Sequence, residues 1–265
     1  AERDFMTELV KVKDASYSRY EELLILRDQY EKEADSLLIA YTQVFGDLTA
    51  DLFEAKIECI RLKKTIAGCQ KFLNRGSQID LAAVEVQVDQ AMSLYEDQLD
   101  QMLYYNEQAR KAVTVSDADA RRVKTMYCRL AKKLHPDMNP ETAGDPELSD
   151  LWNRIVIAYK ESDFREMTEL EVLANRAFEL HGLDSAEVEI PDLEAKIESL
   201  EKEINTILTT EPYTYMAILE DPFKIGEAQA QMKENLQEAK EYAQSLQKML
   251  GQILEKGGVH PWQMN

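Results

Sequence analysis

The sequence predicts an all-α protein in which long antiparallel helical hairpins of the coiled-coil type flank a small helical domain. Gly (9) and Pro (7) are scarce among the 265 residues, and long stretches without a helix breaker are rich in strong helix formers such as Leu, Ala, Glu, Gln and Lys. Apolar residues also recur at steps of three and four, the repeat of one helical face. No alternating pattern typical of β-strands stands out.

Residues 3–73 are expected to form one very long helix or two helices joined end to end. Their apolar stripe consists of Phe5, Leu9, Val12, Leu23, Leu26, Tyr30, Leu37, Tyr41, Val44 and Leu48. Gly76 favours a turn because glycine adopts the left-handed backbone, and Ser77 is a candidate cap for the next helix. That helix runs to about residue 112 with the stripe Leu81, Val84, Val88, Met92, Tyr95, Leu99, Met102 and Leu103. A short turn between two amphipathic helices predicts a hairpin over residues 1–112.

Residues 113–182 differ, because they combine short helical patterns with the one clearly basic cluster of the chain. Asp119 is a candidate cap for a helix here. The inner face of this helix is apolar and consists of Val123, Tyr127, Leu130 and Leu134. Because each helical residue advances by about 100°, the basic residues lie on the outer side and its flanks: Arg121, Arg122, Lys124, Arg129, Lys132 and Lys133.

The basic helix is expected to stop at His135-Pro136-Asp137. Proline restricts the residue before it and has no N–H to donate, so the chain must turn here. A second amphipathic helix is expected over roughly residues 146–178. Its side chains facing back onto the basic helix would be Trp152, Ile155, Ala158 and Tyr159.

The C-terminal region, residues 183–265, is expected to form another hairpin. Heptad-like apolar steps run from Leu193 to Ile207 and from Met232 to Ile253, which is typical of helices packed along a straight seam. Between them, residues 209–222 contain two prolines and cannot be regular helix throughout. The apolar side chains of this connection, Tyr213 and Tyr215 among them, leave two alternatives: they fold back to close the end of a bundle, or they dock a partner.

Residues 118–178 resemble the J-domain of the DnaJ co-chaperone family. The family's second helix typically carries an aliphatic residue, an Ala-Tyr pair and a Leu-Ala-basic-basic run before His-Pro-Asp and Asn-Pro. The residues in the same register are Val123, Tyr127, Leu130, Ala131, Lys132, Lys133, His135, Pro136, Asp137, Asn139 and Pro140. Trp152, Ile155 and Ala158-Tyr159 match the spacing of the family's third helix.

The chain also departs from the family pattern on both sides of this segment. The Tyr-Tyr motif of the family's first helix is not in register, since Tyr104-Tyr105 comes about four residues too early. The end of the preceding long helix is therefore the candidate for that role. No Gly/Phe-rich linker and no cysteine-rich zinc module follow the segment.

The resemblance implies a protein that binds a DnaK-type heat-shock chaperone and stimulates its ATP hydrolysis. The basic helix face would meet an acidic surface of the ATP-bound chaperone, and the His-Pro-Asp loop would touch the junction of its two domains. The implied chaperone-binding residues are His135, Pro136, Asp137, Arg121, Arg122, Lys124, Arg129, Lys132, Lys133 and Asn139. The coiled-coil arms would target the domain or bind a client, and no cofactor is implied.

The net charge of −19 and the pI near 4.6 disfavour nucleic acid and anionic membranes as partners. No apolar run approaches the roughly 20 residues that span a bilayer. The three cysteines form no CxxC pair, so neither a disulfide framework nor a zinc site is expected, and a cytoplasmic location is the default.

No catalytic constellation or phosphate-binding glycine loop is recognisable, so an enzyme is not expected. The alternative to a co-chaperone is a scaffolding coiled-coil protein with a degenerate J-like domain. In either case exposed heptad seams could pair two chains into a homodimer.

Overall fold

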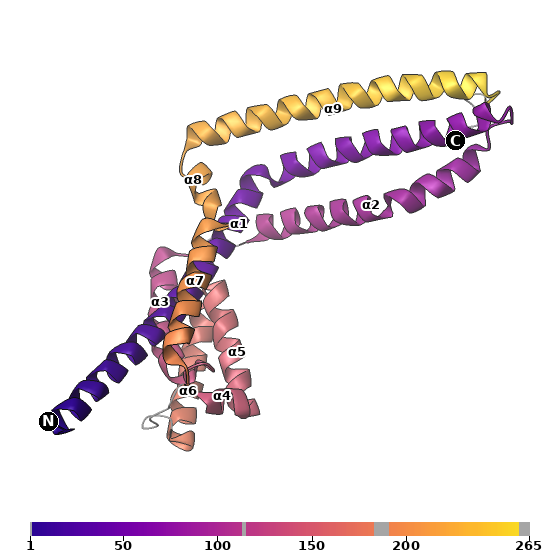
Figure 1. The fold of residues 1–265 in the computed structure, drawn as a ribbon. Helices are drawn as coiled ribbons and strands as arrows, with labels where there is room; N and C mark the ends of the chain where they lie inside the picture. The colour runs from indigo at the N-terminus through magenta and orange to yellow at the C-terminus, as the bar shows by residue number, and fades with distance from the viewer. Residues whose placement is uncertain (1, 113–114, 183–190, 260–265) are drawn as a thin grey trace. The chain divides into compact units, whose positions relative to one another are not determined.

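The computed structural model describes residues 2–112, 115–182 and 191–259, with the backbone alone for residues 2–14. In these residues the regular structure consists of α-helices and one short 3-10 helix, without a strand (Figure 1). The predicted all-α class is therefore confirmed, while the coiled-coil type of packing stays a prediction. The side chains of Phe5, Leu9 and Val12, which begin the predicted stripe, lie outside the described part.

The helices follow one another with short connections. Their bounds are α1 Glu2–Asn74, α2 Leu81–Lys111, α3 Asp117–Leu134, α4 Pro140–Gly144, α5 Pro146–Glu161, α6 Phe164–His181, α7 Leu193–Thr209, η1 Tyr213–Tyr215, α8 Met216–Leu219 and α9 Pro222–Lys256. Of the two alternatives for residues 3–73, a single continuous helix is the one observed.

Contacts group the chain into two compact units, each built from segments that are distant in the sequence. The first unit comprises residues 1–36 and 113–214, and the second comprises residues 37–112 and 215–265. Helix α1 contributes to both. These units are defined by contacts, whereas the three predicted domains, residues 1–112, 113–182 and 183–265, are consecutive segments of the chain. The division into those three domains therefore stays a prediction.

In the second unit, the later part of α1 packs with α2 and α9 (Figure 1). Their shared core contains Ile57, Leu62, Val88, Met92, Leu246 and Leu250. The predicted stripe of α2 is buried at Val84, Val88 and Met92, whereas Leu103 at its end is 49% exposed. The cap of α2 is Asp80 rather than Ser77, because the Asp80 carboxylate accepts the Ala83 N–H at 3.0 Å while the Ser77 hydroxyl donates back to the Phe72 carbonyl.

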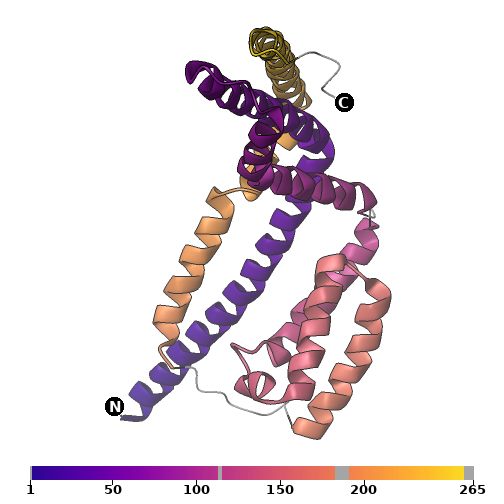
Figure 2. The same ribbon diagram turned by 90° about the vertical axis from the view of Figure 1, so that its right-hand side faces the viewer.

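In the first unit, α3, α5 and α6 pack side by side around one apolar core (Figure 2). The core contains the expected inner face of α3 together with Trp152, Ile155, Ala158 and Tyr159 of α5. The single helix expected over residues 146–178 is wrong. Ser162 adopts a left-handed backbone with φ of 55° that ends α5, and Asp163 caps α6 by accepting the Glu166 N–H.

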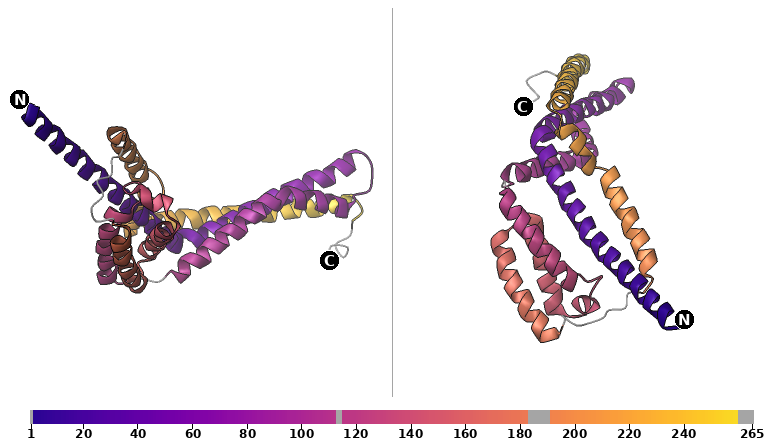
Figure 3. Two further views of the ribbon diagram at one scale, coloured as in Figure 1. Left: turned by 90° about the horizontal axis from the view of Figure 1, so that it is seen from below. Right: turned by 90° about the vertical axis from the view of Figure 1, so that its left-hand side faces the viewer.

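The first part of α1 and α7 complete this unit, with α7 running alongside α1 (Figure 3). Tyr20, Leu23 and Leu24 of α1 share an apolar cluster with Leu200 and Ile204 of α7. The beginning of α3 also differs from expectation. Its cap is Ser116, whose hydroxyl accepts the Asp119 N–H at 3.1 Å, so Asp119 lies in the first turn instead.

The connection over residues 209–222 packs onto α1 in both units. Within the first unit, Tyr213 meets Tyr30 edge to face at 5.7 Å and donates to Glu33 at 3.3 Å. Within the second unit, Tyr215 stacks on Tyr41 with ring centroids 4.0 Å apart. These aromatic contacts agree with the fold-back alternative for the connection.

Gly68→Ala is expected to destabilise the second unit by about 1–3 kcal/mol, the usual cost of overpacking. A methyl group at Gly68 of α1 would stand 2.6 Å from Cγ1 of Val84 in α2, so the two helices would have to move apart. Gly251→Ala in α9 is the matched control, because its methyl group would meet open space. There the higher helix propensity of alanine should stabilise by about 0.5–1 kcal/mol. Denaturant unfolding followed by circular dichroism measures both, and equal stabilisation by both substitutions would contradict the close packing of α1 and α2.

Candidate functional site

The His-Pro-Asp segment forms a tight turn directly after α3. The His135 N–H donates to the Ala131 carbonyl and ends the helix, while the His135 carbonyl accepts the N–H groups of Met138 and Asn139 at 2.9 and 2.8 Å. The Asn139 side chain closes the turn. Its amide donates to the Lys133 carbonyl at 3.0 Å, and its oxygen accepts the Glu141 N–H at the start of α4. The loop is therefore held at both ends by hydrogen bonds.

The loop residues differ in how much of them reaches solvent. His135, Met138 and Asn139 are buried, at 6%, 3% and 7% exposure. Pro136 is half-buried. The Asp137 side chain is 51% exposed, with its carboxylate 3.9 Å from Nδ1 of His135. Within the predicted tripeptide, Asp137 is thus the residue best able to touch another molecule.

His135 is packed against α5 and hydrogen-bonded within the loop. Its ring meets Trp152 at a steep angle, with centroids 5.1 Å apart, and its Nδ1 accepts the Asp137 N–H at 3.1 Å. Burial lowers the pKa of His135 below its ordinary value. The negative charges of Asp28 and Asp137 raise this pKa, whereas the positive charge of Arg27 lowers it further. The neutral imidazole is the form that suits this site.

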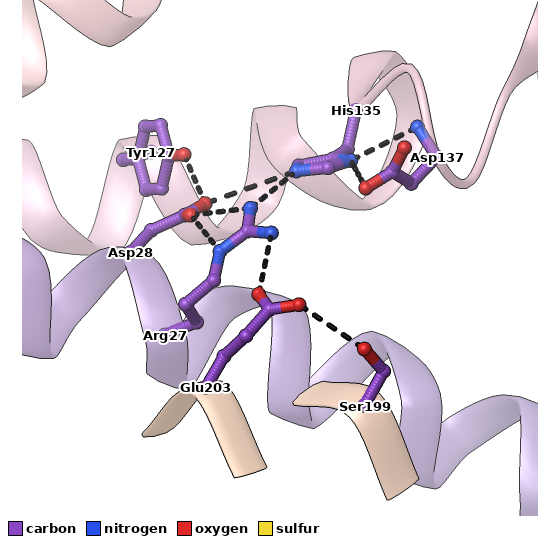
Figure 4. Close-up of polar contacts among 7 residues, drawn as sticks. All are labelled: Arg27, Asp28, Tyr127, His135, Asp137, Ser199 and Glu203. Atoms are coloured by element: carbon purple, nitrogen blue, oxygen red, sulfur yellow. Dashed lines mark hydrogen bonds and ion pairs between the residues drawn. The ribbon is translucent and has the colours of Figure 1, made fainter. Parts of the chain in front are cut away.

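A cluster of polar side chains links α1 to α3 beside His135 (Figure 4). The Asp28 carboxylate, only 12% exposed, accepts the Tyr127 hydroxyl at 2.6 Å and the Arg27 guanidinium at 2.9 Å. Nη2 of the same guanidinium lies 3.4 Å from Nε2 of His135, and its Nη1 lies 3.9 Å from the Glu203 carboxylate of α7. Burial, with the Asp28 charge, raises the pKa of Tyr127, so its hydroxyl stays protonated as a donor.

The basic residues predicted on α3 point to two sides of the helix. On the α1 side, Lys132 pairs with Glu21 at 2.5 Å. On the α6 side, Arg129 pairs with Glu171, and the Lys133 ammonium lies 4.6 Å from the Phe178 ring centroid. The structure thus places the predicted basic residues on one helix, but it engages several of them within the unit.

A groove of about 490 Å³ lies between α3 and α6. It is lined by Arg121, Arg122, Thr125, Met126, Arg129, Phe164, Thr168 and Glu171. The Arg122 guanidinium stands over the Phe164 ring at 5.3 Å and pairs with Asp119 at 3.6 Å. Three arginines beside an aromatic ring form a surface suited to an acidic segment with one apolar side chain.

Some residues of the site could not be predicted from the sequence. The helix next to α3 and the loop is α1 through residues 20–35, rather than the end of α2, which was the candidate for the missing first helix. Tyr104 and Tyr105 lie exposed on α2 in the other unit. Asp28 and Arg27 carry no local signal, since they are charged residues in a long charged helix. For Phe164 the sequence offers one local signal. It directly follows Asp163, a residue type that favours helix caps and that here caps α6.

Lys32 forms the far end of the contact between α1 and the helical bundle. Its ammonium group donates to the Tyr159 carbonyl and, at 2.7 Å, to the Ser162 hydroxyl, and it lies 4.1 Å from the Tyr159 ring centroid. These groups belong to the end of α5. Burial lowers the pKa of Lys32 to about 8, and the positive charge of Lys124 adds to this effect.

Comparison of the chain with protein-family models, with curated proteins and with solved structures finds no significant match. In the described part of the chain, no helix combines the length and apolar character that crossing a membrane requires. Among the same residues, no three His, Cys, Asp or Glu side chains gather as a metal site would need. The fold defines an all-α protein whose candidate functional elements are the loop and the basic helix.

Tyr127→Phe is expected to destabilise the first unit by about 2 kcal/mol, because hydrogen bonds to charged groups are worth about 1.5–3 kcal/mol. The substitution keeps the ring stack on Tyr159, at 3.9 Å between centroids, but leaves the buried Asp28 with one donor fewer. Tyr159→Phe is the control, since its hydroxyl has no hydrogen-bond partner among the described residues. Urea unfolding followed by tryptophan fluorescence measures both. Equal effects would contradict the role assigned to the Asp28 hydrogen bond.

Between pH 8 and 10, the free energy of unfolding should rise with pH more steeply in the natural chain than in Lys32→Met. The pKa of Lys32 is about 8 when folded, against an ordinary value of 10.5. In this window the unfolded chain binds more protons, so raising the pH favours the folded state. Burial raises the pKa of Cys59 and Cys69, which makes the free energy of unfolding fall with pH in both proteins. The informative quantity is therefore the difference in slope between the natural chain and Lys32→Met. Identical slopes would contradict a desolvated amine at Lys32.

Proposed function

We propose that this chain is a J-domain-type co-chaperone, which binds a DnaK-type heat-shock chaperone and stimulates its ATP hydrolysis. The observation that carries the proposal is the exposed carboxylate of Asp137, held by a hydrogen-bonded loop directly after a basic helix. The loop and helix rest on a bundle with its own apolar core, so the carboxylate has a defined position. The free thiols of Cys59, Cys69 and Cys128 suit a reducing, cytoplasmic location.

In this proposal the basic residues guide the encounter, and Asp137 acts once the two proteins have met. Exposed charges at an interface increase the association rate and set the orientation more than they increase affinity. Arg121, Arg122 and Lys124 are exposed charges of α3 available for this role. Asp137 would then favour the chaperone state that hydrolyses ATP, because an effector shifts its partner toward the state that it binds better. The chain itself would catalyse nothing.

The second candidate is a scaffold protein with a degenerate J-like domain. One observation favours it: Lys132 and Arg129 are already paired within the unit, and His135 is buried. The two candidates differ in one measurable property, which is stimulation of a chaperone.

Asp137→Asn is expected to reduce the stimulation of single-turnover ATP hydrolysis by the DnaK-type chaperone of the same cell to its basal rate. The substitution removes a charge from an exposed side chain and leaves the buried loop residues in place. Glu161→Gln is the matched control, because it changes an exposed carboxylate to an amide at the end of α5 remote from the loop. His135→Gln should also abolish stimulation, but its burial makes circular dichroism a necessary companion measurement.

Stimulation by the natural chain should weaken as salt is raised, because salt screens exposed charges beyond about 10 Å at 0.1 M ionic strength. No stimulation at low salt would reject the co-chaperone proposal for that chaperone and favour the scaffold. If stimulation survives in Asp137→Asn, the role that the proposal assigns to Asp137 is wrong.

A further inference from the structure

We infer that residues 20–35 of α1 are a built-in cover, which occupies one flank of α3 and the inner side of the His-Pro-Asp loop, and which the chaperone must displace for full stimulation. The inference rests on the proposed function and adds a mode of regulation to it. The part of α1 concerned is called the cover below.

The cover buries the loop through apolar contacts at its centre. Met138, in the middle of the loop, is 3% exposed and shares a cluster with Tyr20, Leu23 and Leu24 of the cover. The other side of the cover is supported by Leu200 and Ile204 of α7. A partner that approached the loop from this side would meet α1 rather than His135 or Met138.

The cover also places negative charges against the basic helix α3, where an acidic partner would place its own. Glu21 and Asp28 are two helical turns apart and so lie on the same face of α1. Glu21 pairs with Lys132, and Asp28 accepts hydrogen bonds from Tyr127 of α3 and from Arg27, beside His135. An acidic chaperone surface would therefore compete with these carboxylates for the same flank of α3.

The bundle has its own apolar core, and the cover meets it mainly through polar contacts. The core of α3, α5 and α6 is closed by its own side chains, and Ile25 is the cover residue packed against it among the described residues. The remaining contacts between the cover and the bundle are polar. They include the Asp28–Tyr127 hydrogen bond, the contacts of Lys32 with Tyr159 and Ser162, the Lys132 pair, the Gln29 amide on the Cys128 thiol at 3.6 Å, and Lys160 near Asp35 at 3.8 Å. Removal of the cover would expose the flank of α3 and the side chains of Tyr127 and Tyr159 that face it, while the apolar contacts among α3, α5 and α6 remain.

The cover can be locked in place through a thiol already present in the chain. Gln29→Cys would bring a second thiol near Cys128, and a short reducible cross-linker with two thiol-reactive ends would then join α1 to α3. Cys59 and Cys69 are buried in the other unit and less available to the reagent. The locked full-length protein should stimulate ATP hydrolysis at least about fivefold less than before cross-linking, the lower end of ordinary coupling between sites. Reduction of the cross-link should restore stimulation.

A matched control separates locking of the cover from chemical treatment. Arg154 of α5 and Glu166 of α6 are 2.8 Å apart and remote from α1 in sequence and contact. Arg154→Cys with Glu166→Cys, in a chain that also carries Cys128→Ser, accepts the same cross-linker within the bundle. This protein should keep its stimulation when cross-linked.

Glu21→Lys should release the cover, because it places a second positive charge beside Lys132. We expect higher stimulation at subsaturating concentrations of the variant and faster amide hydrogen exchange in residues 135–139. Glu201→Lys is the matched control. It reverses the same kind of charge and breaks the pair of Glu201 with Arg19 at 3.0 Å, which joins α7 to α1 and does not involve α3.

The outcomes separate the cover from the proposed function. A locked protein that stimulates as well as the open one would overturn the cover and leave the co-chaperone function intact. Equal hydrogen exchange in Glu21→Lys and Glu201→Lys would also overturn the cover, without reference to any chaperone. If no form stimulates, Glu21→Lys included, the proposed function fails and the inference fails with it.

Discussion

One buried carboxylate decides how α1 meets the helix that carries the basic residues. Asp28 is nearly enclosed, and a buried carboxylate is costly unless charged or hydrogen-bonding partners surround it. Tyr127 and Arg27 meet this requirement, with His135 close by, so Asp28 brings together α1, α3 and the loop. The orientation of α1, and with it the positions of Glu21 and Lys32 against the bundle, follows from this cluster. His135 is held inward by its packing on Trp152, and burial lowers its pKa although the charge of Asp28 raises it, whereas the Asp137 side chain is half exposed.

The same arrangement changes what the basic helix can do. A helix with six basic residues on its outer side would offer all of them to a partner if it stood alone. In the folded unit, α1 engages Lys132 on one side, and α6 engages Arg129 on the other. Of the other exposed charges, Arg121 and Arg122 lie at the α3–α6 groove, where Phe164 adds an apolar contact, whereas the charge of Lys124 acts on Lys32 of α1. In the proposed function, α1 would therefore limit both the basic residues that an acidic partner can meet and its access to the loop.

Much of the fold was predictable because helix formation depends on local composition and on the apolar repeat. The all-α class, the inner face of α3 and its stop at His135 all come from such local signals. The errors were local as well. Ser162 ends α5 with a left-handed backbone at a non-glycine residue, which the sequence pattern does not reveal. Capping by Asp80 and Ser116 rather than Ser77 and Asp119 shows that several nearby residues can satisfy the same capping rule, and that the final choice depends on where the chain enters the helix.

By itself the sequence determined that this protein is helical, that one helix has a basic outer side, and that a His-Pro-Asp turn follows it. Tertiary structure alone decided which distant segment lies against that turn. Asp28 and Tyr127 are 99 positions apart, and nothing in the composition or periodicity of a long charged helix distinguishes the one carboxylate that becomes buried. The physical reason is that helical periodicity reports which face of a helix is apolar, whereas pairing between helices depends on side-chain complementarity across the whole folded unit.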